Sequence, residues 1–126
     1  MSKRSLIVMA VALLVIFSAV PAFARGGKTG IAMGESNPYE LGEDMTFEIW
    51  NTRTEAPWVE VHCYQGTERV YFEARGMWDS YSLGSVFTLG PTRAWTEGDA
   101  DCTAEVGHFR NGRFKAEAHI DFHVYG

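Results

Sequence analysis

The 126-residue sequence predicts an all-β domain, an antiparallel β-sandwich of six to seven short strands with one disulfide. Three observations lead to this prediction. Apolar and polar residues alternate with a period of two in nearly every apolar segment after Asp44, which is the pattern of half-buried strands. Glycine and proline residues separate these segments at short intervals. The only two cysteines, Cys63 and Cys102, both fall inside alternating segments.

The first 24 residues are interpreted as a secretory signal peptide and are excluded from the fold. Lys3 and Arg4 supply a positively charged start, residues 6–20 form a short apolar stretch, and residues 22–24 form a small-residue cleavage pattern. The apolar stretch is shorter than the roughly 20 residues that a membrane-spanning helix needs. We therefore expect cleavage after Ala24, secretion to the periplasm or the extracellular space, and no stable membrane insertion afterwards.

The remaining chain has the length of one domain. Residues 25–30 are rich in glycine and are interpreted as a flexible leader, so the predicted domain covers residues 31–126. Lys3 and Arg4 are two of the 11 basic residues, whereas all 16 acidic residues follow the signal, so the mature net charge is −7. This charge argues against nucleic acid and anionic membranes as partners, and it is also usual for a soluble secreted protein.

The individual strands follow from the alternation, taken in chain order. A weak candidate lies at residues 31–33. Apolar residues then occupy every second position at residues 45–49 and again at residues 59–63. Four further candidates are residues 68–75, 84–89, 99–106 and 114–124. Six or seven short strands in about a hundred residues favour an immunoglobulin-like sandwich, and a small barrel is the alternative.

An Asn-Gly pair predicts a hairpin between the last two strands. A plain two-residue turn would put the apolar residues of the two strands on opposite faces, so the register must shift by one residue. A bulge at Gly107 or a three-residue loop would supply the shift. We prefer the bulge because it brings Phe109 onto the same face as Phe114 and makes that face wholly apolar. Both solutions place Cys102 opposite Ile120.

Cys63 and Cys102 are predicted to form a disulfide. Both lie at inward positions of predicted strands in a small exported domain, where paired cysteines are usually oxidised. The 38 residues between them leave room for only about two strands. We therefore place them on neighbouring strands of one sheet, unlike the antibody bridge, which joins two sheets. A free reactive thiol or a metal-binding pair is the alternative.

Further evidence comes from a group of segments between residues 57 and 106. They are Pro57-Trp58-Val59-Glu60-Val61-His62-Cys63-Tyr64-Gln65, Val70-Tyr71, Phe87-Thr88-Leu89-Gly90, Trp95 and Gly98-Asp99-Ala100-Asp101-Cys102-Thr103-Ala104. Together they resemble a family of small bacterial secreted or phage-associated immunoglobulin-like domains. The resemblance covers about half of the mature chain. It supports a β-sandwich with a Cys63–Cys102 bridge and implies no activity, cofactor or catalytic residue.

Polar side chains occupy the outward face of the last predicted strand at a spacing of two: Glu117, His119, Asp121, His123 and Tyr125. In the expected register Asp101 lies opposite Asp121 and Glu105 lies opposite Glu117. Like charges that face each other are destabilising unless a cation or a basic group lies between them. One hypothesis is therefore a divalent-metal site, and its ligands would be Asp101, His119, Asp121 and His123, with His62 as a further candidate. The alternative is an ordinary solvated sheet face.

Aromatic residues outnumber what a core of this size needs. Trp78, Asp79 and Tyr81 lie together in a loop with small polar residues. This composition is typical of recognition surfaces, because rigid rings supply contact area at a low cost in conformational entropy. The second hypothesis is a binding module for a protein or a glycan at the cell surface or outside the cell. The alternative is that the rings cap the ends of the sandwich.

The sequence contains no pattern that indicates catalysis. A nucleophile elbow, paired zinc-binding cysteines and a His-Glu-x-x-His segment are all absent from the sequence. We therefore expect neither an enzyme nor a bound cofactor, and we place the function in surfaces used for binding.

Overall fold

The structure is a computed structural model that describes residues 27–35 and 38–126. The predicted signal peptide and the first two residues of the predicted leader lie outside these ranges. Within them the chain forms strands, turns and loops without a helix, which confirms the all-β prediction. The described residues accordingly include no apolar helix of the length needed to cross a membrane.

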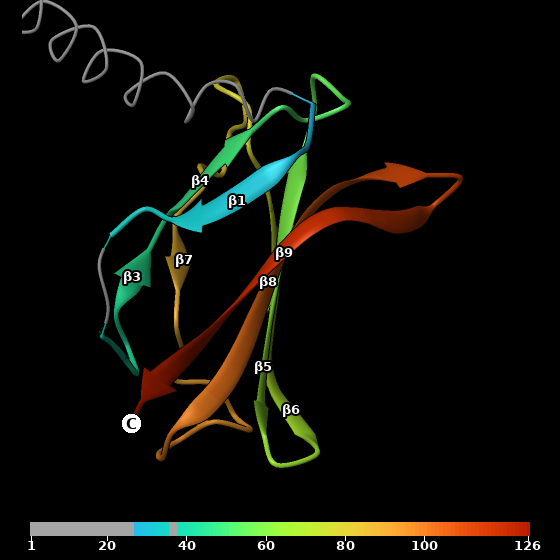
Figure 1. Cartoon of the computed structure of the whole chain (residues 1–126). Helices are drawn as coiled ribbons and strands as arrows, with labels where there is room; N and C mark the ends of the chain where they lie inside the picture. Colours follow the sequence, from blue (N-terminus) through green and yellow to red (C-terminus); the bar gives the residue numbers. More distant parts are fainter. Residues whose placement is uncertain (1–26, 36–37) are drawn as a thin grey trace, which may run out of the picture.

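The largest sheet has five strands (Figure 1). Their order is β2-β9-β8-β5-β6, and neighbours are antiparallel except for β2 and β9, which run parallel. β5 and β8 lie next to each other inside this sheet. Both are long strands along which buried and outward-facing side chains alternate. The five strands are β2 (Tyr39–Glu40), β5 (Trp58–Gln65), β6 (Glu68–Gly76), β8 (Ala100–Arg110) and β9 (Arg113–Tyr125).

Two short sheets form a second layer over one face of the five-stranded sheet (Figure 1). One pairs β1 (Gly30–Met33) with β4 (Phe47–Trp50), and the other pairs β3 (Asp44–Met45) with β7 (Phe87–Thr88). Only Thr46 separates β3 from β4. The two short sheets therefore share one nearly continuous segment, which joins them into a single layer.

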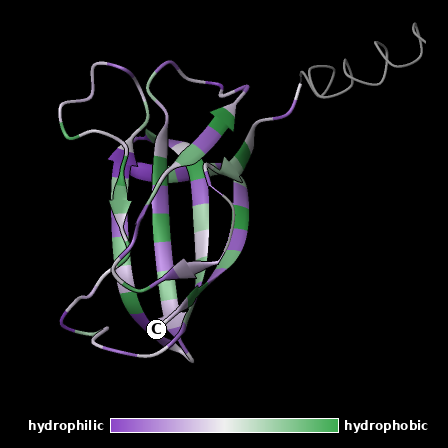
Figure 2. Cartoon of the chain, turned by 90° about the vertical axis from the view of Figure 1, so that its left-hand side faces the viewer, coloured by the Kyte–Doolittle hydropathy of each residue, from purple (hydrophilic) through white to green (hydrophobic). Residues whose placement is uncertain are grey.

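The core lies between the two layers. Along β5 the side chains of Val59, Val61 and Cys63 are fully buried, and the residues between them face outward. Figure 2 shows this alternation as bands of opposite hydropathy along the long strands. The ring of Phe47, on the smaller layer, lies 6.1 Å from the ring of Phe122 on β9. Burial of these apolar side chains is the main force that holds the layers together.

The predicted strands are present with shifted ends, except that the candidate at residues 45–49 is divided at Thr46 into β3 and β4, which pair in different sheets. The candidate at residues 99–106 extends to Arg110 as β8, whereas the candidate at residues 84–89 shortens to the two residues of β7. β1 begins at Gly30, one residue before the predicted domain start. β2 was not among the predicted strands, because two residues are too few to show a period.

The predicted Cys63–Cys102 disulfide is present. The two residues lie directly opposite each other on β5 and β8, with 4.0 Å between their Cα atoms. The bridge therefore links neighbouring strands of one sheet, as the spacing predicted. Both cysteines are buried in the core.

The β8–β9 hairpin contains a bulge beside Gly107, as expected, but the extra residue lies on the other strand. Val106 pairs with Ala118 and Gly107 pairs with Ala116, so Glu117 of β9 has no partner on β8. The predicted bulge has its extra residue on β8. Its direction was wrong because an extra residue on either strand brings the same apolar residues to one face.

The direction of the bulge changes every pairing between it and the disulfide. Cys102 lies opposite Phe122 and not opposite Ile120. Gly107 is needed at the bulge because a Cβ atom there would lie 2.0 Å from the carbonyl oxygen of Lys115. Glycine is the one residue that allows this close approach of the two backbones.

Candidate functional site

The outer face of the five-stranded sheet, which points away from the second layer, carries two groups of side chains. We call the first the polar cluster; its residues are Asp99, Asp101 and His123. We call the second the aromatic cluster; its residues are Trp58, Trp78, Tyr81, Phe109 and Phe114. The polar cluster lies toward the end of β9, and the aromatic cluster lies toward the β8–β9 turn.

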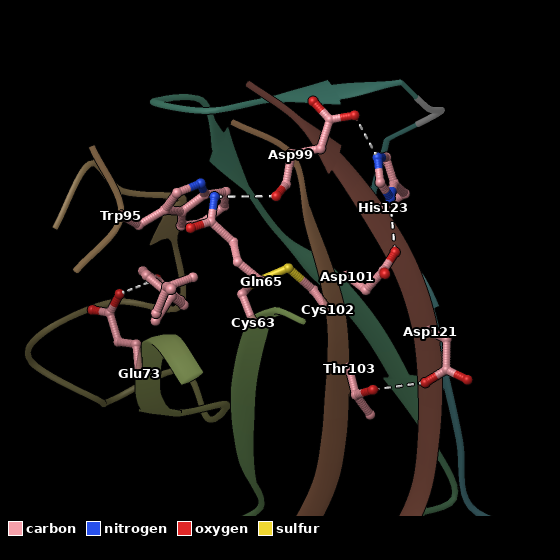
Figure 3. Close-up of a disulfide and its surroundings, with 12 residues drawn as sticks. Cys63, Gln65, Glu73, Trp95, Asp99, Asp101, Cys102, Thr103, Asp121 and His123 are labelled. Carbon is pink, nitrogen blue, oxygen red and sulfur yellow. Dashed lines mark hydrogen bonds and ion pairs between the residues drawn. A yellow bond between two sulfur atoms is a disulfide. The ribbon is translucent and has the colours of Figure 1, made fainter. Parts of the chain in front are cut away.

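His123 occupies the centre of the polar cluster (Figure 3). Its Nδ1 atom lies 2.7 Å from Oδ1 of Asp101, its direct partner on β8. Its Nε2 atom lies 3.0 Å from Oδ2 of Asp99, which precedes β8. A neutral imidazole carries one N–H group, whereas an imidazolium carries two. Both hydrogen bonds can therefore form at once only when His123 is protonated.

The contacts of the polar cluster shift two pKa values in opposite directions. The hydrogen bonds that the His123 ring donates to Asp99 and Asp101 raise the pKa of His123 above its usual 6.5. The backbone N–H of Gly126 donates a 2.8 Å hydrogen bond to Oδ1 of Asp99. This bond and the contact with His123 lower the pKa of Asp99 below its usual 3.8. The cluster is thus an ion pair that favours an imidazolium between two carboxylates.

The register of the hairpin replaces the expected pairs of like charges. Asp101 faces His123 instead of Asp121, and Glu105 faces His119 instead of Glu117. A carboxylate beside an imidazole needs no added cation to offset repulsion. The facing carboxylates that led to the metal hypothesis are therefore absent from the β8–β9 pair.

The four predicted metal ligands are divided among separate contacts. Asp101 and His123 share the polar cluster, whereas Asp121 accepts a 2.7 Å hydrogen bond from Oγ1 of Thr103. Within residues 27–35 and 38–126, no group of three or more His, Cys, Asp or Glu side chains is arranged to hold a metal ion. Asp101 and Asp121 do line one pocket of about 480 Å³ on the sheet, with Tyr64 on its wall. The metal site stays a prediction.

His62, the further candidate ligand, has its own partners on the outer face. Its Nε2 atom lies 3.4 Å from Oε1 of Glu60 and 3.8 Å from Oε1 of Glu105. The ring of Phe72 packs against it, with 4.9 Å between the ring centres. His62 therefore contacts carboxylates that the metal hypothesis did not include.

Trp58 is the centre of the aromatic cluster. Its ring lies 5.5 Å from that of Trp78, 5.3 Å from that of Tyr81 and 5.5 Å from that of Phe109. Trp78 and Tyr81 also contact each other, as do Phe109 and Phe114. These edge-to-face contacts suit the quadrupoles of the rings and hold the five side chains together.

The sequence places Trp58 outward and leaves space around it. Trp58 precedes the buried Val59, so its side chain points to the opposite face of β5. Its partners in the register are Gly76 on β6 and Gly107 on β8. A Cβ atom at Gly76 would lie 2.5 Å from the ring of Trp78. Gly76 thus makes room for the ring of Trp78, whereas Gly107 makes room for the backbone of Lys115.

The structure brings together two of the three residues predicted to bind a partner. Trp78 and Tyr81 contact each other, and the exposed Asp79 lies between them in the chain. Phe109 and Phe114 do share a face, as expected, but they lie on the outer face beside Trp58 and not on the core face. Their position was missed because the bulge had been placed on the wrong strand.

Glu117, the extra residue of the bulge, is turned away from the outer face. Its carboxylate accepts hydrogen bonds from Oγ1 of Thr29 at 3.2 Å and from the backbone N–H of Arg53 at 3.1 Å. Its other oxygen lies 3.3 Å from Nδ1 of His108. The side chain is only 7% exposed. Glu117 therefore connects the hairpin to the segments before β1 and after β4.

The two clusters offer different kinds of interaction. The polar cluster holds its charges in a fixed set of hydrogen bonds, whereas the aromatic cluster presents apolar contact area.

Comparisons of this chain with protein-family models, with curated proteins and with solved structures found no match.

Proposed function

We propose that the protein is a secreted, immunoglobulin-like binding module that contacts a protein partner through its aromatic cluster. Support for the immunoglobulin-like part comes from the strand order. β9, β8, β5 and β6 follow one another as strands G, F, C and C′ do in variable-type domains, and β1, β3/β4 and β7 supply a second layer in the places of A, B and E. The disulfide differs, because it joins the C and F positions within one sheet.

The observation that carries the binding proposal is the gathering of five aromatic rings on the face opposite the core. Burial in the core cannot account for rings on this face. Phe109 remains 46% exposed although it contacts both Trp58 and Phe114. Tryptophan and tyrosine are the residues most enriched at the energetic centres of protein interfaces. A preformed cluster also loses little side-chain entropy when a partner binds.

A protein suits this cluster better than a glycan does. The planes of neighbouring rings meet at angles between 62° and 86°. The rings therefore do not form one flat platform on which a sugar ring would stack. An uneven apolar surface instead fits the side-chain pockets that protein partners offer.

The test compares two exposed phenylalanines of the same sheet. Phe109 belongs to the aromatic cluster and is 46% exposed, whereas Phe72 on β6 lies outside the cluster and is 47% exposed. The mature wild-type domain and the variants Phe109→Ala and Phe72→Ala are immobilised, and binding to proteins from the envelope of the source organism is quantified. We expect Phe109→Ala to weaken binding of the captured protein at least tenfold and Phe72→Ala to leave it unchanged.

The same measurement contains the outcomes that contradict the proposal. If both variants bind equally well, the aromatic cluster is not the contact surface. Binding that free sugars abolish, or that survives protease treatment of the envelope, would assign the surface to a glycan. Near-ultraviolet circular dichroism of both variants checks that the packing of the remaining aromatic rings is unchanged.

A cation site on the outer face of the last two strands is the second candidate function. It is favoured by the pocket that Asp101 and Asp121 line together. Carboxylate oxygens are ligands for hard divalent cations. Thermal unfolding is measured with calcium, with zinc and with a chelator, for the wild type and for Asp121→Asn. A rise in Tm that the variant lacks would support this site, and identical curves would exclude it.

A further inference from the structure

We propose that a pocket beside the bulge of β9 binds a phosphate or sulfate group. The pocket has a volume of about 320 Å³ and lies between the segment before β1, the loop after β4 and the first residues of β9. Its ligand is a small molecule that carries a tetrahedral oxyanion. This inference goes beyond the proposed protein contact, because it concerns a different face of the β8–β9 hairpin.

Three basic residues line this pocket, and each comes from a different segment of the chain. They are Lys28, Arg53 and Lys115. Because two of the 11 basic residues lie in the predicted signal, nine remain in an otherwise acidic mature chain, and three of these nine line one pocket. Lysine and arginine bind phosphate groups in proteins, and the planar guanidinium of arginine can donate two hydrogen bonds at once.

The basic residues of the pocket are not neutralised by acidic partners. Among the ion pairs of the described residues, none involves Lys28, Arg53 or Lys115. Glu117 is the single acidic residue among the described ones that line the pocket, and its carboxylate already contacts the ring of His108. Positive charge therefore exceeds negative charge at the pocket. A bound oxyanion would offset the repulsion among the three cations.

Hydrogen bonds hold the segments around the pocket in place. The carbonyl oxygen of Lys28 accepts a 3.3 Å hydrogen bond from Nδ2 of Asn51, and Oγ1 of Thr29 donates a 2.7 Å hydrogen bond to the carbonyl oxygen of Asn51. The backbone N–H of Arg53 donates a 3.1 Å hydrogen bond to Glu117 on β9. The backbones that carry the cations are thus fixed before a ligand arrives. An oxyanion needs to order only the side chains, which lowers the entropic cost of binding.

The pocket lies on the side of the hairpin opposite the aromatic cluster. Phe114 belongs to the aromatic cluster on the outer face, and Lys115 is the next residue of β9. Successive side chains of a strand point to opposite faces, so Lys115 points away from the aromatic cluster. A protein on the aromatic cluster and an anion in this pocket would therefore occupy different faces of the hairpin.

The negative net charge of the chain does not prevent an anion from binding here. At physiological ionic strength the Debye length is about 8 Å, so exposed charges at greater distances are largely screened. The residues that line the pocket therefore decide the local potential. Glu55 follows Arg53 by two positions but is not among the lining residues.

Titration with sodium phosphate tests the pocket in the full mature domain. The backbone amide resonances of Thr29, Arg53 and Ala116 are followed by NMR at pH 7, and sodium chloride keeps the ionic strength constant. We expect saturable shifts of these resonances with phosphate and with sulfate. Glucose 6-phosphate distinguishes the sources of the group: tighter binding than inorganic phosphate assigns the pocket to an organic phosphate, and equal or weaker binding assigns it to the free ion.

The variants Arg53→Gln and Arg93→Gln form a matched pair. Both remove one exposed arginine from a loop, and Arg93 is not among the residues that line the pocket. We expect Arg53→Gln to weaken phosphate binding about tenfold, because a charge-assisted hydrogen bond is lost, and Arg93→Gln to leave it unchanged. Glu117→Gln removes the negative charge of the pocket and should tighten phosphate binding.

Two results would overturn the pocket. The first is the absence of saturable shifts with both oxyanions, or shifts that sodium chloride reproduces. The second is equal binding by Arg53→Gln and Arg93→Gln, which would show a general effect of net charge. The amide spectra of the variants without ligand report whether the fold is kept. Lys115→Gln should also weaken phosphate binding, and it replaces Arg53→Gln in the comparison if that variant does not fold.

Discussion

Asp101 lies directly opposite His123 across the β8–β9 ladder, with 2.7 Å between Oδ1 and Nδ1. This pairing depends on the single extra residue of β9, Glu117. An extra residue on β8 would have set Asp101 opposite Asp121 instead. The strand that carries the bulge therefore decides whether this face of the sheet holds ion pairs or repelling carboxylates.

The first prediction concerns the acid side of the stability profile. The pKa of Asp99 is lower in the folded chain than its usual 3.8, because Gly126 and His123 bind the ionised form. The folded state thus gains stability from this carboxylate above pH 3.8, and it loses that stability as pH falls through the lowered pKa. Urea unfolding is measured between pH 6 and pH 2. The free energies of unfolding of the wild type and of Asp99→Asn should differ at pH 6 and become equal at acidic pH. A difference that stays constant over this range would contradict the assignment.

The second prediction concerns the disulfide. Cys63 and Cys102 are 39 positions apart, and closing such a loop stabilises the fold by about 4 kcal/mol in the chain-entropy model. The double variant Cys63→Ala/Cys102→Ala should therefore unfold at a markedly lower urea concentration than the oxidised wild type. Peptide mapping without reductant should recover the two cysteines in one linked fragment. Two free thiols in the protein purified without reductant would disprove the bridge.

The third prediction concerns Gly107. A Cβ atom at this position would meet the backbone of Lys115, which cannot move without opening the bulge. We expect Gly107→Ala to lower the free energy of unfolding by about 1–3 kcal/mol. A Cβ atom at Gly27 meets no other atom within 4 Å, so Gly27→Ala should change the free energy of unfolding by less than about 0.5 kcal/mol. Equal effects in urea unfolding would show that the close approach is not needed.

The fourth prediction concerns Glu117. Its removal leaves the backbone N–H of Arg53 and the ring of His108 without this partner, whereas the hydroxyl of Thr29 keeps its 2.7 Å hydrogen bond to the carbonyl oxygen of Asn51. Glu117→Ala should cost about 1–3 kcal/mol of stability, because these donors lose a mostly buried partner. Glu117→Gln keeps an acceptor oxygen and should cost less. Glu55→Ala, at an exposed loop position, is the control and should be nearly neutral in the same unfolding measurement.

Several features of the fold were accessible from local pattern. Alternation along Trp58–Gln65 predicted a strand and identified which of its faces is buried, because side chains of a strand point alternately to its two faces. The spacing of Cys63 and Cys102 predicted neighbouring strands, since few strands fit between them. The loop composition around Trp78 and Tyr81 singled out two members of the aromatic cluster.

Other features needed contacts between distant segments. β2 exists only because β9 supplies its hydrogen bonds, and its two residues carry no pattern of their own. Phe109 and Phe114 joined Trp58 on the outer face, although their apolar character had suggested the core. The polar cluster likewise required Asp99, which lies outside any strand and was not among the predicted site residues.

The sequence by itself therefore determined the class of the fold, the partners in the disulfide and the inward face of β5, because these depend on period and spacing along one chain. Only the tertiary structure decided which residues face each other across β8 and β9. Period two is unchanged when an extra residue moves from one strand to its neighbour, so the apolar pattern is the same for both registers. The backbone contact at Gly107 and the buried contacts of Glu117 select one of them.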